Sequence, residues 1–81
     1  MTEDWRNRIT VNPEILAGKS IIKGTRISIE HILDLLANGW TTETILENYP
    51  QIKRKDITAA LKYAIQILKE DKVYPLPRPS S

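Results

Sequence analysis

The sequence predicts a mainly α-helical fold in which three helices follow a short strand-forming arm. Three segments repeat apolar residues at helical spacing, glycine or proline ends the first two of them, and β-branched residues concentrate before residue 30. We expect a single domain at residues 1–72, with an N-terminal β-hairpin or arm at 8–29, helices at about 29–38, 42–49 and 54–70, and an extended proline-rich tail at 73–81.

The arm contains three short runs that favour extended structure. Residues 8–11 and 20–22 are rich in β-branched side chains, and residues 26–29 alternate polar and apolar positions as a half-buried strand does. Residues 23–25 predict a turn between the last two runs, with a positive φ at the glycine. We expect these strands to pair with one another or with a partner.

The first two helices have side-chain caps at their starts. Ser28 and Thr41 each precede a helical pattern, and their hydroxyls are able to accept a hydrogen bond from a free N–H group of the first turn. Gly39 and Pro50 follow the same two patterns. The sequence therefore predicts two short helices joined by a tight Gly-Trp turn.

The third helix has the strongest periodicity of the chain. Six apolar side chains form one continuous stripe on it, namely Ile57, Ala60, Leu61, Ala64, Ile65 and Leu68. We expect Ile57 and Leu61 to pack inward. The start of this helix is poorly capped, because Lys53 stands where Ser, Thr or Asp is favoured, although Asp56 is positioned to reach back.

The composition limits both chemistry and partners. A chain of 81 residues has a small core, and with no cysteine and one histidine it has little scope for disulfides or a metal, so we expect a homodimer. The one histidine has no serine partner in a tight motif, and we expect neither an enzyme nor a cofactor. No segment has the length or character of a membrane span or a targeting peptide, so we expect a cytoplasmic protein without a membrane partner.

Two apparent motifs have simpler explanations. Residues 18–20 resemble the end of a phosphate-binding loop, but Pro13 stands where that motif requires a glycine. Glu30, His31 and Asp34 lie at neighbouring helical positions and in principle reach one metal ion, yet such groups are common by chance on an amphipathic helix. We interpret them as a solvated face and predict no metal site.

Basic charge concentrates where the third helix begins. The whole chain has a net charge of +2, whereas residues 51–63 hold four basic residues and one acidic residue, a net charge of +3. In a helix-turn-helix protein the N-terminal residues of the last helix contact bases in the major groove. We therefore predict DNA contacts from Lys53, Arg54, Lys55, Thr58 and Lys62, and from Thr41 and Thr42. The alternative is an ordinary solvated helix face.

Two further pairs of side chains have open roles. Lys23 and Arg26 flank the predicted turn and are able to clamp a phosphate or an acidic residue of a partner. The alternative is a purely structural turn in which Arg26 bonds to backbone carbonyls. Trp40 and Tyr49 bracket the second helix and suit the core or a dimer interface better than base stacking.

Several fixed spacings between Ile9 and Ala64 carry a family resemblance. The residues that carry it are Asn12-Pro13-Glu14-Ile15, Gly18-Lys19, Ile22-Lys23-Gly24-Thr25-Arg26-Ile27, Gly39-Trp40, Ile45-Leu46, Tyr49-Pro50, Asp56-Ile57 and Ala60-Leu61. On these residues the chain resembles the bacterial family catalogued as domain of unknown function 433, whose members look like antitoxins of the VapB type. The chain departs from the family at Ser20 and Ser28, where proline is frequent, and at Lys53, where Ser or Thr is frequent.

The resemblance implies a homeodomain-like or winged helix-turn-helix fold with a strand-forming arm and no catalysis. For some members it also implies a toxin partner with a PIN-like ribonuclease domain. We therefore expect a dimeric antitoxin that binds operator DNA and represses its own operon, with residues 73–81 or the arm before Val11 on the toxin. The alternative is a protein-interaction module that does not bind DNA, favoured by Glu43 and Glu47 on the second helix.

Overall fold

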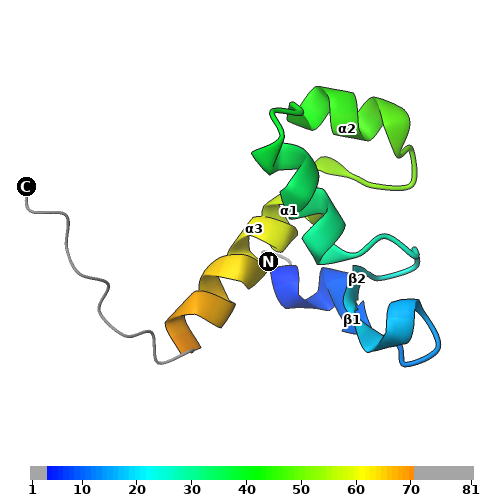
Figure 1. Cartoon of the computed structure of the whole chain (residues 1–81), viewed down its shortest axis with the longest axis vertical. Coiled ribbons are helices and arrows are strands. Elements are labelled where there is room, and N and C mark those ends of the chain that lie inside the picture. Colours follow the sequence, from blue (N-terminus) through cyan, green and yellow to red (C-terminus); the bar gives the residue numbers. More distant parts are fainter. Residues whose placement is uncertain (1–3, 71–81) are drawn as a thin grey trace, which may run out of the picture.

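The computed structural model describes residues 4–70, which form three α-helices after a two-stranded antiparallel sheet (Figure 1). The expectation of a mainly helical fold with an N-terminal hairpin is confirmed. The expected tail at 73–81 lies outside the described residues. The elements in chain order are the 3₁₀ helix η1 (Trp5–Arg8), β1 (Ile9–Val11), the 3₁₀ helix η2 (Leu16–Gly18), β2 (Ser20–Ile22), α1 (Ile29–Ala37), α2 (Thr42–Asn48) and α3 (Arg54–Glu70).

The sheet consists of β1 and β2 alone, paired so that Ile9 lies opposite Ile22. The turn after β2 has the expected positive φ, +84° at Gly24. The expectation of a third strand at residues 26–29 is wrong, since this segment forms only an isolated bridge between Ile21 and Ser28. The physical reason is that Ser28 is already the N-cap of α1, so the chain enters the helix before a strand can extend.

Both predicted caps are confirmed. The His31 backbone N–H donates to Ser28 Oγ at 2.9 Å, and the Thr44 backbone N–H donates to Thr41 Oγ1 at 3.1 Å. Gly39, with a φ of +93°, follows the end of α1 in a conformation that side chains rarely adopt. Capping and termination thus place α1 and α2 within a residue of their predicted bounds.

The core lies where α1, α2 and the first half of α3 meet the sheet. Its buried members are Ile22, Ile29, Ile32, Leu35, Ile45, Ile52, Ile57 and Ala60. Trp40 and Tyr49 are half-buried and pack against this cluster, in agreement with the core role expected for them.

The inward packing expected on α3 is confirmed for Ile57 and wrong for Leu61. Ile57 and Ala60 are buried and Ala64 is half-buried, but Leu61, Ile65 and Leu68 are 45%, 51% and 63% exposed. The buried side of the helix also includes Asp56 and Ala59, so it is turned away from Leu61. Figure 1 shows the last turns of α3 projecting beyond α1 and α2. Periodicity defined the stripe, but neighbouring elements cover only part of it.

Candidate nucleic-acid interface

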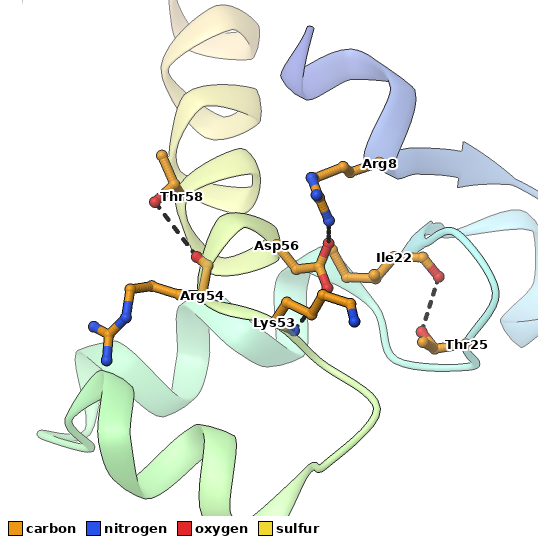
Figure 2. A network of polar contacts seen from close by, with 7 residues as sticks. All are labelled: Arg8, Ile22, Thr25, Lys53, Arg54, Asp56 and Thr58. Carbon is orange, nitrogen blue, oxygen red and sulfur yellow. Dashed lines mark hydrogen bonds and ion pairs between the residues drawn. The ribbon is translucent and has the colours of Figure 1, made fainter. Parts of the chain in front are cut away.

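A buried carboxylate holds the start of α3 (Figure 2). Asp56 is 4% exposed; its Oδ2 accepts a hydrogen bond from the Lys53 backbone N–H at 2.8 Å, and its Oδ1 accepts one from Arg8 Nη1, also at 2.8 Å. The reach of Asp56 back to Lys53 is therefore confirmed. Because Arg8 belongs to η1, the same carboxylate fixes the first turn of α3 against the N-terminal arm.

The predicted cationic side chains lie around this fixed start and face solvent. Lys53, Arg54 and Lys55 are exposed, although the backbone that carries them is anchored. Thr58 and Lys62 are exposed one and two turns further along. The Thr58 hydroxyl donates to the Arg54 carbonyl at 3.5 Å, a long contact that leaves it able to reach another group. The structure thus exposes all five predicted residues, Lys53 just before α3 and the other four on its surface.

Arg54 has an acidic neighbour on α2. Its Nη2 lies 3.2 Å from Glu43 Oε2, and both side chains are more than 60% exposed. A hydrogen bond from its own backbone N–H lowers the pKa of Glu43, and the Arg54 guanidinium lowers this pKa further. Exposed pairs of this kind are weak, so a phosphate or base edge is able to compete for Arg54. The sequence analysis did not foresee this pair, because it depends on how α2 lies against α3.

The start of α2 is less available than the start of α3. Thr41 is exposed, but its hydroxyl caps the helix and also lies 2.9 Å from the Thr44 hydroxyl. Thr42 is half-buried. Both threonines lie close in sequence to Glu43, which pairs with Arg54 at the start of α3. Their hydroxyls are less available to a ligand than the exposed lysines are.

The turn after β2 presents two cations with no intramolecular role. Lys23 and Arg26 are exposed, and neither side chain has a hydrogen bond or ion pair within residues 4–70. The alternative in which Arg26 bonds to carbonyls is therefore wrong. The Lys23 backbone N–H donates to the Arg8 carbonyl at 2.8 Å, so the turn is tied to the residue that also holds Asp56. Figure 2 shows the turn and the start of α3 on either side of the Arg8–Asp56 pair.

Two of the three residues considered for metal binding, Glu30 and His31, have other side-chain partners. Lys19 Nζ lies 2.9 Å from Glu30 Oε1, and His31 Nε2 lies 2.9 Å from the Tyr49 hydroxyl. Across residues 4–70 no three His, Cys, Asp or Glu side chains gather in a way that suits a metal ion. In the same part of the chain, no helix has both the length and the apolar character needed to cross a membrane.

Comparison with known proteins identifies the family of this chain. Residues 9–64 match the family described as proteins of unknown function, DUF433. The chain belongs to DUF433. An uncharacterized protein of Sinorhizobium fredii, y4eO, is 32% identical to this DUF433 chain over 59 residues, which are 73% of the chain and 27% of that relative.

A solved DUF433 structure has the same fold. A DUF433 member protein from Anabaena variabilis superposes with a TM-score of 0.73 at 28% identity, over 80% of this chain and 64% of its own. The chain therefore spans about a quarter of the length of its curated relative and less than two thirds of the solved one. Neither comparison assigns a ligand to the basic surface described above.

Proposed function

We propose that this DUF433 protein is a DNA-binding antitoxin that represses its own operon, with α3 in the major groove. The observation that carries the proposal is the start of α3, where exposed Lys53, Arg54 and Lys55 surround a first turn fixed by buried Asp56. A rigid helix start with outward cations is what base reading requires, because contacts to base edges depend on a fixed register.

Each side chain suits a particular part of a duplex. Arg54 matches a guanine edge or a phosphate, and Thr58 matches a thymine methyl group. The exposed lysines match phosphates, as do Lys23 and Arg26 on the neighbouring turn, which would act as a small wing. In this arrangement α2, the turn after it and α3 form a helix-turn-helix of the homeodomain-like or winged kind.

The proposal includes two partners beside DNA. A homodimer would set two copies of α3 about 34 Å apart, the length of one DNA turn. A toxin with a PIN-like ribonuclease domain would bind the arm before Val11 or residues 73–81, which are outside the described residues. Either contact would leave the outer surface of α3 free for DNA.

A second candidate function is a protein-interaction module without DNA binding. The Arg54–Glu43 pair favours it, because an acidic side chain on α2 weakens the field that would attract phosphates. The two candidates predict different effects on DNA binding when the charges of Arg54 and Lys55 are reversed.

The test is a salt-titrated binding assay with the full chain, using DNA from upstream of its own gene and random duplex of equal length. The repressor predicts a preference for the upstream DNA and a binding constant that falls steeply with salt. The variant Arg54→Glu/Lys55→Glu should lose this binding, whereas Lys19→Glu, a charge reversal outside the interface, should keep it. No preference at any salt, with toxin neutralisation intact in the double variant, would establish the module instead.

A further inference from the structure

We propose that the C-terminal half of α3 is a docking surface for an acidic amphipathic helix of another protein. The inference goes beyond the DNA contact and stands without it, although the two surfaces share Lys55 and Lys62. Its centre is an apolar stripe of Leu61, Ile65 and Leu68, whose exposed fractions are 45%, 51% and 63%. These spacings of four and three residues place the three side chains on one face of the helix.

A hollow beside the apolar stripe offers room for inserted side chains. It measures about 600 Å³ and lies between α3 and α1. Ala64, Ile67 and Leu68 line it from α3, and Ile29 and Leu33 line it from α1. The charged groups at its edge, Lys19 and Glu30, neutralise each other at 2.9 Å. An apolar ridge beside an apolar hollow is the form of surface that accepts an amphipathic helix.

A row of lysines determines the charge of the partner. Lys55, Lys62 and Lys69 are spaced seven residues apart, so they follow one line along α3 next to the apolar stripe, and all three are exposed. Within residues 4–70 none of them makes an ion pair or a hydrogen bond; Lys62 lowers the pKa of Asp4 only weakly, without direct contact. A partner helix with acidic residues beside its apolar face would supply the missing counter-charges.

The same row argues against a second copy of this chain as the occupant. An antiparallel pair of α3 helices centred between Ile65 and Gln66 would set Lys62 opposite the second copy's Lys69, twice over. A parallel pair would extend the seam to Arg54 and bring two guanidinium groups together. Repulsion between like charges disfavours both arrangements, whereas an acidic helix would place opposite charges beside the lysines.

The probe is a pair of helix-forming synthetic peptides with the same leucine stripe, one flanked by glutamates and the other by lysines. Fluorescence anisotropy with the full chain should show the glutamate peptide binding at least about tenfold more tightly, with the preference shrinking as salt rises. The variant Ile65→Ser/Leu68→Ser should lose this binding. Leu16→Ser, which also removes an exposed apolar side chain, should retain it.

A charge-swapped variant keeps the proposal testable if the serine variant is poorly folded. Lys62→Glu/Lys69→Glu should reverse the preference, so that the lysine peptide binds better. Equal binding of both peptides to the unmodified chain, or an unchanged preference in the swapped variant, overturns the proposal. It also fails if sedimentation shows self-association that Ile65→Ser/Leu68→Ser abolishes, or if vesicles with anionic lipid bind while neither peptide does.

Discussion

The two halves of α3 differ in what holds them. All four buried residues of the helix, Asp56, Ile57, Ala59 and Ala60, lie in its first seven positions. Beyond Ala60 the helix has apolar residues at the same spacing but no fully buried one. A regular apolar pattern is enough to form a helix, whereas burial depends on which neighbours the fold supplies. The first half is therefore a structural element and the second half is a surface.

The largest effect is expected at Asp56. Replacing it with alanine removes the Asp56 carboxylate from Arg8 and the acceptor from the Lys53 N–H, and breaking a largely buried pair costs about 3 kcal/mol or more. Chemical denaturation of Asp56→Ala should show this loss. Asp56→Asn, which keeps an acceptor for Lys53, should lose less. Equal losses in the two variants would show that a neutral acceptor at this position recovers nothing, so that the charge on Asp56 carries the whole effect.

A pair of truncations tests the difference between the halves directly. Ile57 is 3% exposed within the core, so Ile57→Ala should lower the free energy of unfolding by about 2–4 kcal/mol. Leu61→Ala, one turn later and 45% exposed, should cost about 1 kcal/mol or less. The two variants are compared by urea denaturation of the full chain. A cost at Leu61 that equals the cost at Ile57 would mean that the second half is covered in solution.

The caps of α1 and α2 should contribute less than the core does. Ser28→Ala and Thr41→Ala each remove a hydroxyl that accepts a first-turn N–H, which is worth about 1 kcal/mol. Ser28 is buried and Thr41 is exposed, so water replaces the lost acceptor more easily in α2 and the Ser28 variant should suffer more. Thermal unfolding of the two variants measures this order, which a larger effect at Thr41 would contradict.

The smallest effect should come from an exposed ion pair. The hydrogen bond from Lys19 holds the pKa of Glu30 below its ordinary value of 4.5, and the charge of Lys19 adds to this effect. A carboxyl whose pKa is lower in the folded state stabilises the fold above its unfolded pKa and loses that contribution as pH falls through the folded pKa. The melting temperature should therefore fall slightly less between pH 5 and pH 3 in Glu30→Gln than in the unmodified chain. An identical fall in both proteins would contradict a role for this pair.

Local chemistry made much of the fold predictable. Ser28, Thr41 and Gly39 determine where α1 and α2 begin and where α1 ends, and these signals act over one helical turn. The reach of Asp56 to Lys53 was predictable for the same reason. The contact of Asp56 with Arg8 was not, since 48 residues separate the two.

The sequence-based predictions failed where one residue fits the pattern of two elements, or where tertiary contacts determine which side chains are buried. Ser28 belongs to a strand-like pattern, but it caps α1. Because the helix begins directly after it, the strand cannot extend beyond an isolated bridge. The apolar pattern of α3 did not show that Ala59 would face the core while Leu61 would not. The cations of the proposed interface were recognisable from charge alone, but the Arg54–Glu43 pair needed the relative placement of two helices. The DNA contacts themselves remain a prediction.

The Arg8–Asp56 pair also couples two regions that the proposed function uses separately. Asp56 receives one hydrogen bond from the N-terminal arm and one from the first turn of α3, so a partner that reorients Arg8 also changes how Lys53 is held. If the proposed partners bind at the arm and at α3, the two binding events would be thermodynamically linked, and each would alter the affinity of the other by the same factor. A single carboxylate would thus give this small domain a route by which a partner bound to the arm changes the affinity of α3 for the DNA proposed above.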